Sequence, residues 1–203
     1  MIQIISISIF RVSTTFKDIK KYKNVVLFLI AFWCYSEGIG TIIKMATIYG
    51  KELNISNTDL LGAFILVQFI GVPATFMFGY FASKIGTKNS ILLSLFVYTW
   101  ICVFGYFIKT GWHFWLLSFF VALVQGGSQA LSRSFYAKII PVHKSSEFFS
   151  FFAISEKFAG ILGPILFSLL SQIFQNSRFS IIGLIIFFIV GMIILSRVKE
   201  SPS

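Results

Sequence analysis

A carboxyl group, a hydroxyl group and an amine recur at helical spacing in the first long apolar stretch of the sequence. Glu37, Thr41 and Lys44 stand at i, i+4 and i+7, so an α-helix would present all three on one face. Such a face could bind a polar solute or carry a proton along a transport pathway. Glu37 and Lys44 would lie about 10 Å apart along the helix axis, too far for a direct ion pair. Lys44 stands near the end of the stretch, so its amine could instead extend into water.

A second polar stripe runs through the fourth apolar stretch. Four residues at i, i+4, i+7 and i+8 make it up: Gln125, Gln129, Ser132 and Arg133. They share one helical face, and Gln125, Gln129 and Arg133 are our candidates for lining a solute pathway. The structural alternative is hydrogen bonding of amides between neighbouring helices, worth about 1–2 kcal/mol or less. We expect a packing hydrogen bond of that kind for Gln68 in the second stretch.

The fifth apolar stretch carries an adjacent acid and base, Glu156 and Lys157. Neighbouring residues on a helix point about 100° apart, so these two do not face each other. Glu156 lies at a depth similar to that of Arg133, which predicts an ion pair between the two helices. The pair could open and close as a gate, or it could be a permanent structural contact. Glu37 and Glu156 are also the acidic side chains within the apolar stretches that could carry a proton.

The sequence offers no motif for a metal centre, a bound cofactor or enzymatic catalysis. Cys34 and Cys102 both fall in apolar stretches, without ligand-like spacing to His113 or His143. We therefore expect two small hydrophobic side chains rather than a disulfide or a metal site. The chain has no phosphate-binding glycine-rich loop, no serine-hydrolase or zinc-protease motif and no calcium-binding loop. We expect no cofactor and no enzymatic activity.

Six long apolar stretches must position these side chains. They span residues 25–47, 60–81, 90–107, 113–134, 148–173 and 180–195. Most approach the roughly 20 residues with which an α-helix crosses a bilayer. Their continuous apolar character favours helices over the alternating strands of a barrel. The composition agrees, since 57% of the residues are hydrophobic and 12% are charged. The sequence therefore predicts an all-α membrane protein with six transmembrane helices.

The net charge of +10 follows the expected membrane topology. If the N-terminus is cytoplasmic, twelve of the 17 Lys and Arg residues fall on the inner side, three fall in outer loops and two lie within spans. This bias predicts that both termini are cytoplasmic. It also predicts contact with anionic membrane lipid rather than with nucleic acid. We expect a multi-pass protein of a bacterial inner (plasma) membrane.

Three segments are expected along the chain. Residues 1–24 would form a cytoplasmic linker or interfacial segment, residues 25–196 the transmembrane bundle and residues 197–203 a cytoplasmic tail. The bundle divides into two triplets of spans of about equal length, 25–107 and 113–195. Because each triplet has an odd number of spans, the second is inverted relative to the first. Inverted three-helix repeats are a recurring plan of secondary transporters.

Two short motifs resemble those of the major facilitator superfamily. The loop at residues 79–89 has glycines at 79 and 86, basic residues at 84 and 88, and Ser83 where the superfamily has an acid. Gly79 would let two helices approach closely and Gly86 would allow a tight turn. Lys84 and Lys88 would keep the loop on the inner side or take part in gating. Residues 160–164 of the fifth span are similar to a superfamily helix motif whose glycines permit close packing and whose proline, here Pro164, can bend the helix.

A longer run in the fourth span carries a more specific resemblance. Residues 124–134 (Val-Gln-Gly-Gly-Ser-Gln-Ala-Leu-Ser-Arg-Ser), continuing to Ile140-Pro141, resemble the vacuole-effluxer (autophagy-related) family of that superfamily. Residues 41–50, 66–69 and 155–160 support it. The resemblance covers residues 25–200 and the C-terminal six-helix half of the family's twelve-helix permease. Ser36-Glu37-Gly38 stands where the family often has Asn-Asp-Gly, so the carboxylate is kept and an amide is lost.

The resemblance implies half of a secondary active transporter that moves a small solute, such as an amino acid, by alternating access. It also implies that the first and fourth spans line the central cavity. One six-helix bundle transports nothing alone, so a separately encoded N-terminal half or a second copy of this chain would complete the pathway. The alternative is a truncated, inactive permease fragment, which the linker-like residues 11–24 also fit.

Overall fold

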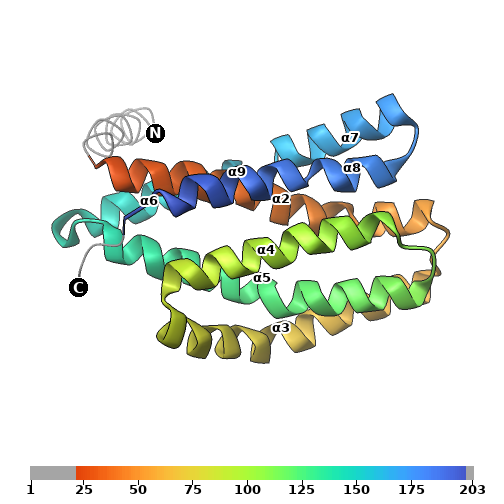
Figure 1. Cartoon of the computed structure of the whole chain (residues 1–203), viewed down its shortest axis with the longest axis horizontal. Coiled ribbons are helices and arrows are strands. Elements are labelled where there is room, and N and C mark those ends of the chain that lie inside the picture. The colour runs from red at the N-terminus through yellow and green to blue at the C-terminus, as the bar shows by residue number, and fades with distance from the viewer. Residues whose placement is uncertain (1–21, 200–203) are drawn as a thin grey trace, which may run out of the picture.

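The structure, a computed structural model, describes residues 22–199 of the chain. Within that range it holds helices and no strands, and six spans are long and apolar enough to cross a membrane. Figure 1 shows these spans running along the long axis of the molecule. The predicted all-α membrane fold is therefore confirmed. Most of the expected segment 1–24, and residues 200–203 of the expected tail, lie outside the described residues.

The first four spans are single helices: α2 (Lys23–Glu52), α3 (Asn57–Ile85), α4 (Thr87–Tyr106) and α5 (Gly111–Ile139). The fifth comprises a 3-10 turn, η1 (Val142–Lys144), followed by α6 (Ser145–Phe158) and α7 (Leu162–Phe174). The sixth comprises α8 (Ser177–Gly183) and α9 (Ile185–Ser196). Most helices extend past the predicted apolar stretches, because polar capping residues belong to the helix ends. The hydroxyl of Ser56, for example, accepts the backbone N–H of Asp59 at 3.1 Å and caps α3.

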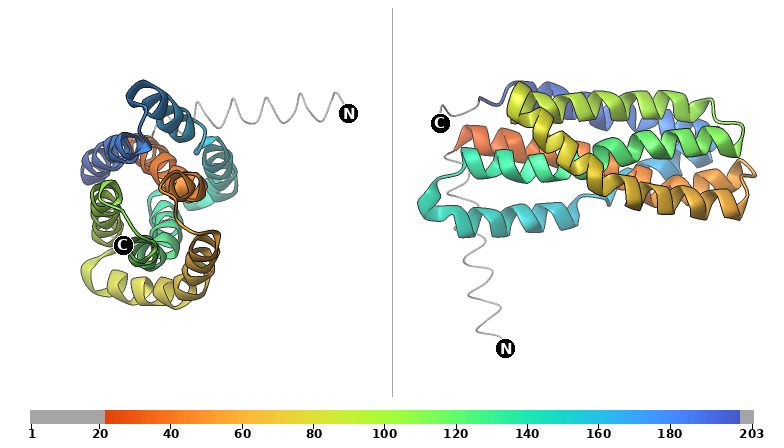
Figure 2. Two further views of the ribbon diagram at one scale, coloured as in Figure 1. Left: turned by 90° about the vertical axis from the view of Figure 1, so that its right-hand side faces the viewer. Right: turned by 90° about the horizontal axis from the view of Figure 1, so that it is seen from below.

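Contacts between the spans follow the symmetry of two three-helix repeats. The first span packs on the sixth and the fifth, whereas the fourth span packs on the third and the second. The third and sixth spans pack on each other. Exchanging first with fourth, second with fifth and third with sixth turns this set of contacts into itself, as inverted repeats require. Seen end-on in Figure 2, α3, α4 and α5 gather on one side of the bundle and α2 and α6 to α9 on the other.

The two sides are not equally well packed. Helix α3 packs along α5 far more extensively than the fifth span packs on α2. Helix α7 buries only Gly163 and Phe167. The fifth span therefore packs less closely on the first span than its symmetry mate, the second span, packs on the fourth.

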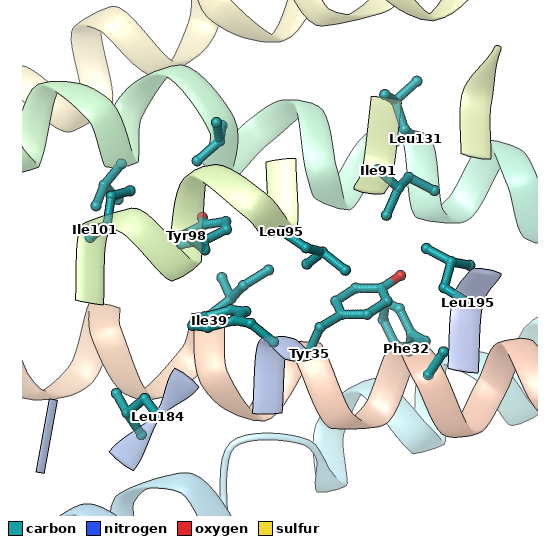
Figure 3. Close-up of a cluster of buried hydrophobic side chains, with 14 of the residues drawn as sticks. Phe32, Tyr35, Ile39, Ile91, Leu95, Tyr98, Ile101, Leu131, Leu184 and Leu195 are labelled. Carbon is teal, nitrogen blue, oxygen red and sulfur yellow. The ribbon is translucent and has the colours of Figure 1, made fainter. Parts of the chain in front are cut away.

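The core lies where α2, α4, α5 and α9 meet (Figure 3). The hydroxyl groups of Tyr35 and Ser132 are 2.6 Å apart, which joins the first and fourth spans by a buried hydrogen bond. Phe188 stacks on Tyr98 with their ring centroids 5.2 Å apart. Phe188 also lies against Gly38, where a Cβ would come within 2.7 Å of the ring. Gly38 thus lets the first and sixth spans approach each other.

Gly86 makes the turn between the second and third spans. Its φ of 89° and ψ of 150° lie in a region that is almost exclusive to glycine, so the predicted tight turn is confirmed. The predicted close approach at Gly79 is wrong within residues 22–199, because a Cβ there would meet no heavy atom within 4 Å. Gly79 is exposed on α3.

Lys84 and Lys88 flank this turn and hold its surroundings in place. The amine of Lys84 lies 4.5 Å from the centre of the Tyr80 ring, a cation–π geometry. The amine of Lys88 donates to the carbonyl oxygens of Ser196 at 2.8 Å and Val198 at 2.7 Å. Lys88 therefore ties the start of the third span to the end of the sixth.

Replacing Gly86 by alanine is expected to lower the free energy of unfolding by about 1–3 kcal/mol, the cost of holding a non-glycine residue in this backbone region. Thermal unfolding in detergent micelles, followed by circular dichroism, would measure the loss. Gly79→Ala is the matched control, since it adds the same methyl group to an open position. Equal stability of the two variants would contradict this account of the turn.

Candidate functional site

The fifth span is interrupted at residues 159–161, between α6 and α7. Gly160 has a φ of 95°, a conformation that costs glycine little and other residues much more. The expected bend at Pro164 is corrected, because the break comes four residues earlier. Pro164 is the third residue of α7, where a missing N–H costs nothing because the first four N–H groups have no partner within the helix. Gly160, not Pro164, breaks the span.

Polar side chains of α2 satisfy the backbone groups that the break sets free. Oε2 of Glu37 accepts the N–H of Gly163 at 2.8 Å, and the amine of Lys44 donates to the carbonyl oxygen of Gly160 at 2.9 Å. The Thr41 hydroxyl donates to the carbonyl oxygen of Glu37 at 2.6 Å and packs against Gly163. Glu37, Thr41 and Lys44 share one face, as their spacing predicts, and that face is turned toward the fifth span. We call these three residues the α2 clasp.

The α2 clasp matters because a bilayer offers no water to an open backbone. Each unpaired N–H or C=O group in the hydrocarbon core costs several kcal/mol. A carboxylate at the first turn of α7 also interacts favourably with the positive end of the helix dipole. The Glu37 side chain is buried, with 1% of its surface exposed. Its second oxygen, Oε1, has no hydrogen-bond partner among residues 22–199.

Outside the clasp contacts, three helices present polar side chains on an open face. Lys44 of α2 and Gln129 and Arg133 of α5 are exposed, and Glu156 of α6 is half-buried. We call these four residues the polar face. A cavity of about 140 Å³ between α2, α5 and α6 is lined by Lys44, Gln129 and Glu156 together with Ser36 and apolar side chains. An amine, an amide and a carboxyl group thus border one small cavity.

The α5 stripe also borders α3. A second cavity, of about 160 Å³, is lined by Gln68, Thr75, Gln125 and Gln129 among others. Oε1 of Gln125 is buried and has no hydrogen-bond partner in the described part of the chain. The packing hydrogen bond expected for Gln68 is absent from residues 22–199, and Gln68 is exposed to this cavity instead. Gln129 borders both cavities and so joins them into one polar strip.

The predicted ion pair between the fourth and fifth spans is confirmed. Nη2 of Arg133 lies 2.8 Å from Oε1 and 3.0 Å from Oε2 of Glu156. The two side chains are 58% and 35% exposed, so the pair opens onto the polar face. The neighbouring Lys157 is exposed and forms no ion pair with the described residues. Ser132, the fourth member of the α5 stripe, is buried against Tyr35 and does not reach the face.

Sequence reasoning missed two participants in this site. Ser36 lines the cavity beside Lys44, and Gly163 supplies the N–H that Glu37 accepts. The adjacency of Ser36 to Glu37 and the glycine immediately before Pro164 were the available signals, and neither specifies a partner. No group of three or more His, Cys, Asp or Glu within residues 22–199 could hold a metal ion. Cys34 is half-buried, Cys102 is buried, and both are free thiols.

Replacing Gly163 by alanine is expected to lower the free energy of unfolding by about 1–3 kcal/mol, the usual cost of forcing atoms into a packed site. The added Cβ would overlap the Thr41 hydroxyl and lie 2.7 Å from the carbonyl oxygen of Glu37. Chemical unfolding in micelles would measure the change. Gly40→Ala faces the same break, but its Cβ would lie at an ordinary 3.7 Å from Gly160. If Gly163→Ala were as stable as Gly40→Ala, the described contact between α2 and α7 would be wrong.

Known proteins match most of the chain, and one family model matches all of it. Residues 1–203 match the protein family described as vacuole effluxer Atg22 like. An uncharacterized MFS-type transporter of Bacillus subtilis, YxiO, is 39% identical over 193 residues, which cover 95% of this chain and 45% of that protein. Autophagy-related protein 22 of Saccharomyces cerevisiae is 33% identical over 179 residues, or 82% of this chain and 34% of that protein. The protein of the same name in Yarrowia lipolytica is 28% identical over 205 residues, or 92% and 34%.

The chain thus spans less than half the length of these relatives. The family match, the six membrane spans and the repeat symmetry agree with the resemblance that the residues of the fourth span carry. The chain belongs to the vacuole effluxer Atg22-like family, and its Bacillus relative is named as an MFS-type transporter.

Proposed function

We propose that the chain forms the C-terminal six-helix half of a secondary transporter and moves a small solute by alternating access. The polar face carries this proposal. Lys44, Gln129 and Arg133 are exposed on membrane-spanning helices, and a charged side chain that faces lipid costs up to about 2.5–3.5 kcal/mol, the value at the bilayer centre. A water-filled pathway shared with a second bundle would remove that cost. The whole pathway therefore requires a partner, either a separate N-terminal half or a second copy of this chain.

We propose an amino acid as the solute. The 140 Å³ cavity is bordered by the amine of Lys44 and the carboxyl group of Glu156, which suit a solute that carries a carboxylate and an ammonium group. The amides of Gln125 and Gln129 would hydrogen-bond the solute along the strip that joins the two cavities. The Arg133–Glu156 pair would act as a gate, breaking when Glu156 turns to the solute and re-forming after release. Lys157 would supply a further positive charge beside that gate.

The proposed setting is a bacterial inner membrane with both termini in the cytoplasm. Lys84, Lys88 and Lys138 gather at one end of the bundle, where Lys138 donates to the Thr87 hydroxyl at 3.1 Å. Lys51 and Arg178 stand at helix ends on the other side. A concentration of basic residues at one end is typical of the cytoplasmic side and favours contact with anionic lipid.

Flux measurements test the proposal directly. The chain is reconstituted into proteoliposomes alone, and also after co-expression with the part of the Bacillus relative that lies outside the matched residues. The liposomes are loaded with a radiolabelled amino-acid mixture, and efflux is followed. We expect Gln129→Leu to slow efflux by about tenfold or more, the effect of losing a hydrogen bond worth about 1.5 kcal/mol. Lys109→Gln, in an exposed loop, is the matched control and should change nothing.

The two reconstitutions distinguish between the two proposed partners. Efflux with the chain alone would identify a second copy as the partner, whereas efflux only with the co-expressed part would identify a distinct half. Absence of efflux from both arms, with both polypeptides folded in the membrane, would contradict the transport function and favour an inactive permease fragment.

A further inference from the structure

The carboxyl group of Glu37 has one satisfied and one unsatisfied oxygen deep in the bundle. Oε2 accepts the N–H of Gly163 at 2.8 Å, while Oε1 has no hydrogen-bond partner among the described residues. The side chain is 99% buried, since its relative exposure is 1%. Oε1 is therefore an open acceptor position that solvent does not reach in this conformation.

Other charged groups near α2 bond to other residues or face solvent. Helices α7 and α9, which flank the Glu37 side of α2, contain no titratable side chain. On α5 and α6, Arg133 and Glu156 pair with each other, and Lys157 is exposed. Asp59 of α3 bonds Ser56 and Trp115, and Arg178 of α8 donates to the carbonyl oxygens of Tyr106 and Ile108.

Two titratable groups share the helix and the side of Glu37. Lys44 donates to the Gly160 carbonyl oxygen, and Cys34 lies one turn before Glu37 as a free thiol. Within residues 22–199 Glu37 forms no ion pair. Its carboxylate is therefore compensated by one backbone N–H and by the positive end of α7.

We infer that the carboxyl group of Glu37 is the binding site for a coupling proton, and that the bound proton loosens α7 from α2. The proton joins Oε1 and converts the carboxylate into a neutral carboxylic acid, while Oε2 remains available to Gly163. No covalent bond to carbon is made or broken, and release of the proton to water restores the carboxylate. The inference rests on the transport function proposed above, since the proton is meant to drive movement of the solute.

The helix break at Gly160 is the point about which a loosened α7 would move. Gly160, with its φ of 95°, separates α7 from α6. Helix α7 buries only Gly163 and Phe167, and at Gly163 it meets Glu37 and Thr41 of α2. Neutralising Glu37 removes the attraction between its charge and the α7 dipole at that contact. Helix α7 can then pivot at Gly160 while α6 keeps the Arg133–Glu156 pair.

The Arg133–Glu156 contact makes Glu156, the other acidic side chain of the apolar stretches, the less suitable proton carrier. Glu156 is partly exposed and is bound by a guanidinium group that bridges both carboxylate oxygens. A proton there would have to displace Arg133. Glu156→Gln is therefore the matched control for Glu37→Gln, because it removes a carboxyl group of the same type from a neighbouring span.

Infrared spectroscopy of the purified full chain in lipid nanodiscs tests the binding step without any transport. Acidification should produce the C=O band of a buried protonated carboxyl group. The band should be lost in Glu37→Gln and retained in Glu156→Gln. Should Glu37→Gln fail to fold, Glu37→Asp keeps the test decisive, because it should shift the frequency of the band. A spectrum without the band, a band that does not change with pH, or one that persists unshifted in the Glu37 variants would overturn the proposal.

Spin labels test the loosening step. Labels on Ile48→Cys of α2 and Ile173→Cys of α7, in a Cys34→Ala/Cys102→Ala background, report the separation of the two helices. Acidification should shift the distance distribution to longer values, and Glu37→Gln should show the long distances already at neutral pH. If the label distances did not depend on pH, or if acidification shifted them equally in Glu37→Gln, the proposed loosening of α7 would be overturned. Neither readout depends on flux. An inactive transporter could therefore still bind the proton, and an active transporter could fail to bind it, so the two proposals can fail separately.

Discussion

The structure depends on how the backbone of the fifth span is paired inside a medium without water. A helix that crosses lipid satisfies its own N–H and C=O groups, and a break is tolerated only where protein or an internal cavity supplies partners. Here the partners come from α2: Glu37 accepts from Gly163, and Lys44 donates to Gly160. The polar residues of the first span and the glycines of the fifth therefore form one unit. Without the other, either the polar side chains or the open backbone would be left unpaired in lipid, which costs several kcal/mol per group.

This unit breaks the symmetry of the two repeats. The second span runs unbroken as α3 and packs closely along α5, whereas its counterpart in the other repeat is divided into α6 and α7. The division leaves α6 beside the polar face, where Glu156 meets Arg133, and leaves α7 attached to α2 near Gly163. One joint at Gly160 thus lies between the proposed solute cavity and the proposed proton site. Discontinuous helices at binding sites are a recurring device of secondary transporters.

Much of the fold follows from the sequence, because lipid imposes simple rules. Apolar runs of bilayer length predicted all six spans, and helical periodicity placed Glu37, Thr41 and Lys44 on one face. Similar depth predicted the contact of Arg133 with Glu156. What periodicity cannot give is the rotation of one helix against another. Ser132 and Arg133 are adjacent, yet one is buried against Tyr35 and the other is exposed. Glycines are ambiguous for the same reason: Gly163 packs against a neighbour, Gly160 breaks a helix and Gly79 contacts nothing nearby.

Amide hydrogen exchange at Gly163 tests the central claim most directly. The chain in nanodiscs is exchanged in deuterated buffer and fragmented so that the amides of residues 159–163 are resolved singly. If Glu37 satisfies the break, Glu37→Leu should speed exchange at Gly163 by about tenfold or more, as loss of a hydrogen bond worth about 1.5 kcal/mol predicts. Amides in the middle of α4 should be unchanged. Equal protection of Gly163 in the wild type and in Glu37→Leu would contradict the account, because another group would then be pairing the break.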